Sequence, residues 1–220
     1  MTTAPLPFDA VERLSLPDAE LTLWPDFLAA PGAQHLFREL EATAPWEQSL
    51  IRIAGRSLTI PRLNVWYGDP GTNYGYSGAR LASHPWTPAL AALRGQVETI
   101  TGHRFNSALL NCYRSGRDSV DWHSDDEAVL GPEPVIATLS LGVARRFELR
   151  HHSQAGLRRQ LGLESGSLLL MAGPMQRHWR HRIPKEPAVE GARISITLRL
   201  VRSVREWAAL PSMVRDPGGC

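Results

Sequence analysis

The chain has 220 residues, of which 43% are hydrophobic and 21% are charged, and its formal net charge is +2. This composition is ordinary for a globular protein, and the length suffices for one hydrophobic core, so we expect a single domain over residues 1–220. No apolar run is long enough to cross a bilayer, and the first residues lack the pattern of a secretory signal. We therefore expect a cytoplasmic protein that does not bind membranes.

Two segments have the periodicity of amphipathic helices. In residues 31–43, apolar side chains recur at helical spacing. Residues 86–102 carry a stronger signal, because Thr87 can cap a helix, Pro88 suits its first turn and Gly102 can end it. We expect a helix in each segment, the second with an apolar stripe formed by Leu90, Leu93, Val97 and Ile100.

The remaining periodic segments alternate as β-strands do. Residues 50–61 resemble a hairpin with Gly55 near its turn. Two helices followed by many short strands predict an α+β fold whose strands form a sandwich or a barrel. The other expected strands lie in residues 105–113, 135–141, 145–151, 166–173 and 193–201.

The sequence HSDD at 123–126 offers a pair of metal ligands. His123 and Asp125 are two residues apart, so in an extended segment their side chains share a face. A third ligand from a distant strand would complete a 2-His-1-carboxylate triad, which leaves positions open on non-haem iron(II). The HWRH run at 178–181 contributes two more histidines, although HxxH is also common on surface helices. From these residues alone, both interpretations remain open.

The expected last strand carries polar side chains on one face. Alternation in RISITLRL places Ile194, Ile196, Leu198 and Leu200 on the face opposite Arg193, Ser195, Thr197 and Arg199. The polar face is either exposed to solvent or part of a pocket for a dicarboxylate, because arginine pairs bidentately with carboxylates. The same alternation in residues 105–113 places Asn111 and Tyr113 together and turns Cys112 away.

Arginine carries nearly all of the positive charge. Lys185 is the only lysine, and arginines cluster in residues 144–152, 157–159 and 176–182. Biased codon usage is one explanation. The alternative is a polyanionic partner, since guanidinium groups bind phosphate oxygens.

Seven motifs occur in an order and spacing that resemble the AlkB family of iron(II)/2-oxoglutarate dioxygenases. The resemblance covers roughly residues 50–201 and is most similar to the branch that repairs alkylated duplex DNA. The motifs are PRLNVWYGDPGTNYGYSG (61–78), NCY (111–113), DWHSDDE (121–127), PVIATLSLG (134–142), GSLLLMAGP (166–174), HWRHRIP (178–184) and RISITLR (193–199).

The resemblance implies a fold, a reaction and partners. The fold is a double-stranded β-helix, or jelly roll, over about residues 105–201, with N-terminal helices and a nucleotide-recognition lid over about residues 50–78. The cofactors are Fe(II), 2-oxoglutarate as cosubstrate and O2. The reaction is oxidative demethylation of 1-methyladenine or 3-methylcytosine with release of formaldehyde. The substrate is alkylated DNA, single-stranded or duplex, or RNA, and we expect a monomer.

Matched by position, the resemblance assigns the iron and the cosubstrate to particular residues. It makes His123, Asp125 and His181 the iron ligands and leaves His178 as a neighbour. It assigns the 2-oxoglutarate contacts to Asn111, Tyr113, Arg193, Ser195, Thr197 and Arg199, with Arg193 on the distal carboxylate.

The resemblance also implies contacts to a base that is flipped out of the helical stack. Tyr74, Tyr76 and Asp126 match the positions that hold the base, and Arg62 and Glu127 match supporting positions. Such flipping is required because the methyl group lies on the Watson–Crick edge, which an intact stack hides.

Two positions depart from the family pattern. Ser195 stands where the family usually has asparagine, which shortens or removes one hydrogen bond to the cosubstrate. Ala54 stands at the hairpin tip where duplex-repairing relatives tend to place an aromatic wedge. This second departure leaves open the choice between single-stranded DNA, duplex DNA and RNA.

A zinc-dependent hydrolase is the alternative enzyme class. His123, Asp125 and His181 could hold zinc and activate a bound water. That hypothesis gives Arg193 and Arg199 no function.

Overall fold

Short strands make up most of the chain in the computed structural model, which describes residues 11–53, 56–72, 75–76, 79–80 and 83–202. An eight-stranded sheet, the major sheet, has the order β1-β2-β14-β11-β16-β9-β5-β8. Its strands are β1 (Glu12–Leu16), β2 (Ala19–Trp24), β5 (Leu63–Gly68), β8 (Ser83–His84), β9 (Ser107–Tyr113), β11 (Ile136–Gly142), β14 (Leu168–Ala172) and β16 (Arg193–Arg199).

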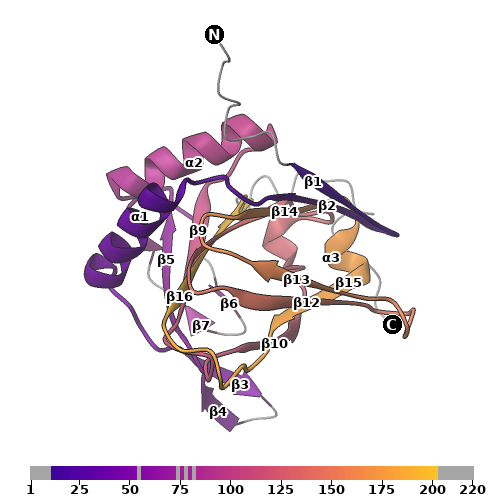
Figure 1. Ribbon diagram of the computed structural model, residues 1–220. Helices are drawn as coiled ribbons and strands as arrows, with labels where there is room; N and C mark the ends of the chain where they lie inside the picture. Colours follow the sequence, from indigo (N-terminus) through magenta and orange to yellow (C-terminus); the bar gives the residue numbers. More distant parts are fainter. Residues whose placement is uncertain (1–10, 54–55, 73–74, 77–78, 81–82, 203–220) are drawn as a thin grey trace.

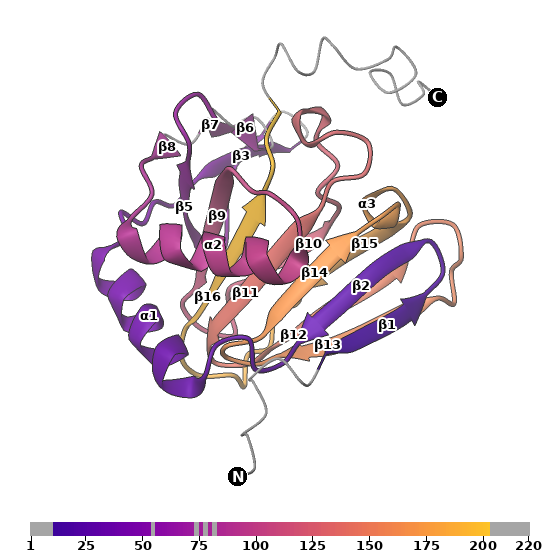
Figure 2. The same ribbon diagram turned by 90° about the horizontal axis from the view of Figure 1, so that it is seen from above.

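A four-stranded antiparallel sheet, the minor sheet, has the order β10-β15-β12-β13. Its strands are β10 (Val120–His123), β12 (Arg145–His151), β13 (Arg158–Leu163) and β15 (Trp179–Ile183). Two further hairpins are β3 (Leu50–Ile53) with β4 (Arg56–Thr59) and β6 (Gly75–Tyr76) with β7 (Ala79–Arg80). Strands β3, β4 and β6 lie within the expected lid, and β7 directly follows it. Figure 2 shows β3, β6, β7 and β8 gathered at one end of the molecule.

The two predicted helices are present and lie side by side on the outer side of the major sheet, as both views show (Figures 1 and 2). Helix α1 spans Ala30–Thr43 and helix α2 spans Pro88–Thr101. The Thr87 side chain accepts a hydrogen bond from the backbone N–H of Leu90, and Gly102 ends α2 in the left-handed region with a φ of 73°. Thr87 therefore caps the helix N-terminus and Gly102 supplies the left-handed C-terminal residue, as the sequence indicates. Two single-turn helices, η1 (Ala128–Leu130) and α3 (Met175–His178), complete the described elements.

Apolar side chains pack in two layers, one on each face of the major sheet. The outer layer joins the helices to the sheet and includes Leu40, Leu90, Val97, Leu110 and Ile196. The inner layer fills the space between the two sheets and includes Trp66, Leu109, Phe147, Met171 and Trp179. Two facing sheets with helices on one side confirm the predicted α+β fold and have the architecture of a double-stranded β-helix.

The start of the chain differs from the expectation that helices come first. Strands β1 and β2 precede α1 and form a hairpin in which Leu16 pairs with Ala19, leaving Pro17 and Asp18 in the turn. Strand β2 then pairs with β14 and extends the major sheet. Within the described part of the chain, no helix is both long and apolar enough to span a bilayer.

Candidate active site

Strands β10 and β15 bring two histidines together on the inner face of the minor sheet. His123 and His181 are direct partners in the antiparallel pairing, and their ring centroids are 4.3 Å apart. Asp125 follows β10, and His181 Nε2 lies 3.6 Å from its Oδ2. One ligand atom from each of His123, Asp125 and His181 lies within 4.8 Å of the others, so the three side chains can share one metal ion.

Asp125 is held from two sides. Its Oδ1 accepts a hydrogen bond from Nη2 of Arg199 on β16, and this pair forms a buried salt bridge. Its backbone N–H donates to Oε1 of the buried Gln176 over 2.9 Å. Burial alone would raise the pKa of Asp125, but the charge of the neighbouring Arg199 outweighs it and lowers the pKa. The carboxylate is therefore ionised and fixed in orientation.

Both histidines are in the neutral form that metal binding requires. Burial, followed by the neighbouring His123, lowers the pKa of His181 to about 3, and burial also lowers the pKa of His123. His123 Nδ1 lies 2.7 Å from the Asp121 carbonyl oxygen, which can only accept, so Nδ1 carries the proton and Nε2 keeps a lone pair. The Phe147 and His181 rings are stacked with their centroids 5.2 Å apart, so Phe147 excludes solvent from that side of His181.

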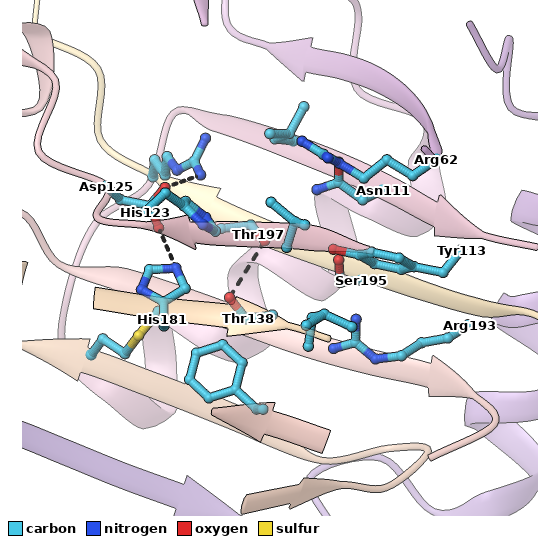
Figure 3. A pocket seen from close by; sticks show the side chains of 16 residues that line it. Arg62, Asn111, Tyr113, His123, Asp125, Thr138, His181, Arg193, Ser195 and Thr197 are labelled. Carbon is cyan, nitrogen blue, oxygen red and sulfur yellow. Dashed lines mark hydrogen bonds and ion pairs between the residues drawn. The ribbon is translucent and has the colours of Figure 1, made fainter. Parts of the chain in front are cut away.

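Arg193 and Tyr113 occupy the other end of the same cavity. Figure 3 shows them on the side opposite the three potential metal ligands. Arg193 is 1% exposed, and its Nη2 donates to Ser140 Oγ over 2.8 Å. Its Nε and Nη1 have no hydrogen-bond partner within the described residues. Burial lowers the pKa of Arg193 to about 10, which leaves it cationic at neutral pH. This end of the cavity can therefore bind a carboxylate.

The strand faces predicted by alternation are confirmed with one exception. Arg193, Ser195, Thr197 and Arg199 are buried and line the cavity, as do Asn111 and Tyr113. Cys112, Ile194, Ile196 and Leu198 point to the outer apolar layer. Leu200 was expected among them but is 41% exposed, because β16 ends at Arg199. The polar face is thus part of a pocket, and its exposure to solvent is excluded.

Arg62 joins the expected lid to the cosubstrate end of the cavity. Its Nε donates to Asn111 Oδ1 over 2.9 Å, and its Nη1 donates to the Ser119 carbonyl over 3.3 Å. Arg62 is buried and lines the cavity. The structure therefore places Arg62, a predicted base support, in direct contact with Asn111, a predicted cosubstrate contact.

The other predicted base contacts lie outside the cavity lining or outside the described residues. Asp126 is exposed and Glu127 is half-buried, and both follow Asp125 directly. Tyr76 belongs to β6, of which the structure describes the backbone. Tyr74 and Ala54 lie outside the described residues.

His178 is separated from the predicted iron ligands by a change of secondary structure. It ends α3, whereas His181 lies on β15, so the two histidines do not share a helix face. His178 instead lies near His151 and Asp18, with one potential ligand atom of each within 4.8 Å of the others. His151 Nδ1 accepts hydrogen bonds from the backbone N–H groups of Ser153 and Gln154, so its Nε2 carries the proton and donates to Asp18 over 3.2 Å. This second group therefore joins β12 to the turn after β1 by a hydrogen bond.

Several cavity residues were missed from the sequence. Phe147, Met171 and Thr138 line the cavity, and Thr138 Oγ1 donates to Thr197 Oγ1 over 3.4 Å. Gln176 lies behind Asp125. Alternation in the strands could have indicated the first three, but no local signal indicates Gln176.

A two-sheet β-fold with a buried His-Asp-His group and a basic carboxylate pocket is characteristic of the iron(II)/2-oxoglutarate oxygenases. The family model of the 2OG-Fe(II) oxygenase superfamily matches residues 20–199. The chain is 38% identical to human alpha-ketoglutarate-dependent dioxygenase alkB homolog 3 over 192 residues, covering 83% of this chain and 66% of that protein. It is 36% identical to the human DNA oxidative demethylase ALKBH2 over 179 residues, covering 77% of this chain and 69% of that protein. The chain therefore belongs to the AlkB family.

A solved structure supports the fold independently of close sequence similarity. The structure of OsALKBH1 superposes with a TM-score of 0.60 at 16% identity, covering 87% of this chain and all of that one. The chain spans slightly less than two thirds of the length of the alkB homolog 3 proteins. Identities to the two curated groups are similar, so they do not select a branch.

The donor atoms fit the cofactors of this family, which are Fe(II), 2-oxoglutarate and O2. Two neutral imidazoles and one carboxylate leave three coordination positions open for a chelating keto acid and oxygen. The unpartnered Nε and Nη1 of Arg193 fit the distal carboxylate of the cosubstrate. Family membership favours this oxygenase over the zinc-dependent hydrolase that the three ligands alone left open.

Proposed function

We propose that the chain is an oxidative demethylase that repairs 1-methyladenine and 3-methylcytosine in DNA. The observation that carries the proposal is one cavity with His123, Asp125 and His181 at one end and Arg193 at the other. A cosubstrate with two carboxylates fits between these ends. Family membership and the name of the DNA oxidative demethylase ALKBH2 support a methylated base as the second substrate.

The residues of this chain would divide the work as follows. His123, Asp125 and His181 would hold the iron, and Arg199 would keep Asp125 ionised and oriented. Arg193 and Tyr113 would bind the distal carboxylate of 2-oxoglutarate, with Asn111, Ser195 and Thr197 along its length. Bound there, Fe(II) with O2 would supply the oxidation that converts 2-oxoglutarate to succinate and CO2 and the methyl group to hydroxymethyl. The hydroxymethyl product would lose formaldehyde and restore the base.

Base recognition would come from the lid and from the segment after Asp125. Tyr74 and Tyr76 would contact the flipped base, with Asp126 hydrogen-bonding to it and Arg62 and Glu127 in support. Arg62 also bonds to Asn111, which couples the lid to the cosubstrate end of the cavity. Base flipping is least costly in single strands or at damaged pairs, so the absence of an aromatic side chain at Ala54 favours single-stranded DNA over intact duplex.

A product assay on four substrates tests this function. Purified protein with Fe(II) and 2-oxoglutarate is incubated with 1-methyladenine in single-stranded DNA, in duplex DNA and in RNA, and with unmethylated DNA. With methylated DNA we expect formaldehyde in an amount equal to the succinate formed above the level seen with unmethylated DNA, and neither above background with Asp125→Ala. Succinate release without formaldehyde from any methylated substrate would overturn demethylation, and formaldehyde from RNA alone would move the substrate to RNA.

A further inference from the structure

The outer face of the minor sheet carries a concentration of arginines. Its inward side chains pack against the major sheet, so every second residue of each strand points outward. The outward positions hold five arginines, one glutamate and three uncharged residues. They are Trp122, Arg146, Glu148, Arg150, Arg158, Gln160, Gly162, Arg180 and Arg182. Five arginines and one glutamate give this face a net charge of +4, although the whole chain has a formal net charge of only +2.

Three of these arginines form a row across neighbouring strands. Arg150 on β12 pairs in register with Arg158 on β13 and with Arg180 on β15. No ion pair joins any of the three to an acidic side chain in the described part of the chain. Like charges placed directly opposite each other destabilise a sheet. A row of three therefore costs stability, which a bound anion would recover.

The next row along the same strands is neutralised. Glu148 is the register partner of both Gln160 and Arg182, and Arg182 Nε donates to Glu148 Oε2 over 2.7 Å. Arg146 pairs with Glu186 at 3.0 Å. Among the described outward positions of the minor sheet, the arginines without an acidic partner are therefore Arg150, Arg158 and Arg180.

Trp122 fixes the orientation of this face. The guanidinium groups of Arg150 and Arg182 lie 4.3 Å and 4.5 Å from its ring centroid. Such cation–π contacts hold the Arg150 side chain against the sheet and leave its guanidinium group positively charged. Arg158 and Arg180 are exposed on either side of Arg150 and point to solvent.

The arginine row lies close to the predicted iron site. Leu149, His181 and His123 form the adjacent row on the inner face of β12, β15 and β10. Strand β10 is the edge of the minor sheet, and its consecutive residues Trp122 and His123 belong to the outer face and to the cavity. A polynucleotide that delivers a base to the cavity can therefore pass around β10 onto the arginine row.

We propose that Arg150, Arg158 and Arg180 bind the phosphates of the single strand that flanks the target base. This inference rests on the proposed function, because it assumes a nucleic-acid substrate. The row spans three strands, a width of about 10 Å, which accommodates more than one phosphate of an extended strand. Guanidinium forks bind phosphate oxygens irrespective of sequence, so the contact would strengthen binding without selecting the lesion.

A binding assay that needs no catalysis tests the row. Arg158→Gln/Arg180→Gln is compared with wild type by fluorescence anisotropy on an unmethylated, labelled 15-mer of single-stranded DNA at several salt concentrations. We expect affinity to fall on the order of tenfold at low salt, and the slope of log K against log salt to shrink by about 1.4, or about 0.7 per lost phosphate contact. Arg38→Gln/Arg104→Gln removes the same charge from exposed positions on the helix side and should leave both quantities unchanged.

A kinetic comparison separates failure of the row from failure of the proposed function. With 3-methylcytosine in the 15-mer, the row variant should have a raised KM and an unchanged kcat. With the same lesion in a trinucleotide, which is too short to reach the row, it should match wild type. Equal salt slopes for the row variant and wild type would overturn the inference. A wild type that demethylates neither substrate would overturn the proposed function, while the anisotropy comparison would still decide on the row.

Discussion

His123 and His181 face each other across the antiparallel pair β10–β15, with their ring centroids 4.3 Å apart. The two histidines are separated by 57 residues in sequence, and the register of strands β10 and β15 alone brings them together. Because direct partners in an antiparallel sheet lie about 5 Å apart, the pairing itself presents two imidazoles to one ion. Asp125, held by Arg199 and Gln176, supplies the third ligand.

The first prediction concerns metal binding. Replacing His123, Asp125 or His181 by alanine should abolish demethylation and weaken Fe(II) binding by more than the roughly 10–100-fold that loss of an outer partner costs. His178→Ala should retain most of both, because His178 lies with His151 and Asp18. Titration with Co(II) as a spectroscopic substitute for Fe(II), followed by its visible absorption, measures the relative loss of metal affinity in each variant. Loss of metal from His178→Ala together with retention in His181→Ala would reverse the assignment.

The second prediction concerns the cosubstrate. Arg193→Lys should raise the KM for 2-oxoglutarate by roughly 10–100-fold, because a lysine cannot replace a buried bidentate pair and a hydrogen bond to a charged group is worth about 1.5–3 kcal/mol. Reaction with 2-oxobutyrate, which lacks the distal carboxylate, should be affected far less. Arg38→Lys, at an exposed position on α1, serves as the matched control. An unchanged KM in Arg193→Lys would place the carboxylate elsewhere.

The third prediction identifies Gln176 as a positioning residue for Asp125. Gln176→Leu leaves the buried Asp125 N–H without its acceptor and should weaken metal binding by about 10–100-fold. Gln176→Glu keeps an acceptor oxygen at the same place and should restore much of the affinity. Metal titration is paired with thermal unfolding of the metal-free protein. A lower melting temperature with unchanged metal affinity would reduce Gln176 to a packing role.

The fourth prediction concerns the base. Tyr76→Ala should lower demethylation by roughly one to two orders of magnitude at subsaturating DNA, since stacking on an aromatic ring is worth about 1–3 kcal/mol per base. Tyr76→Phe keeps the ring and should be nearly silent. Slow succinate formation without DNA should persist in both, because the iron and cosubstrate residues are unchanged. If Tyr76→Ala demethylates as well as wild type, Tyr74 becomes the candidate platform, because Trp66 is fully buried in the inner apolar layer.

Periodicity predicted those parts of the cavity that lie within one strand. In residues 193–199, alternation separates Arg193 and Thr197 from Ile194 and Ile196, and the structure has the same division. It works because β16 is buried on both faces, so each side chain must be matched to a polar or an apolar environment. Beyond Arg199 the strand ends, and Leu200 no longer follows the pattern.

Contacts between distant segments could not be predicted in the same way. Arg62 donates a hydrogen bond to Asn111, 49 residues away in sequence. Gln176 accepts one from the backbone of Asp125, 51 residues away. The register of the sheets decides which of these distant side chains come into contact. The β1–β2 hairpin had a weak signal, since Pro17-Asp18 separates two short alternating runs, but each run has at most six residues. The HWRH run was ambiguous because the chain changes from helix to strand between its two histidines.

The last prediction concerns the buried arginine behind the cosubstrate end of the cavity. The Arg145 side chain is fully buried, and it donates to Glu186 Oε2 over 3.0 Å and to the carbonyl oxygens of Ser115, Asp118 and Pro184. Its guanidinium carbon lies 5.7 Å from the Tyr113 ring centroid. Loss of the Glu186 charge would leave this cation without its carboxylate partner, so Glu186→Gln should destabilise the protein by about 2–4 kcal/mol at neutral pH.

The effect of acid on this pair has a definite sign. Burial alone would raise the pKa of Glu186, but hydrogen bonds from Arg145 and Arg146 outweigh it and lower the pKa below that of a free glutamate. A carboxylate with a lowered pKa in the folded state stabilises fully above its unfolded pKa of about 4.3, and this contribution is lost as pH falls through the folded value. Urea unfolding should therefore show the full difference between wild type and Glu186→Gln at pH 7, and a smaller one below about pH 4. A difference that stays constant over this range would show that the charge of Glu186 contributes nothing, and that the substitution acts through packing alone.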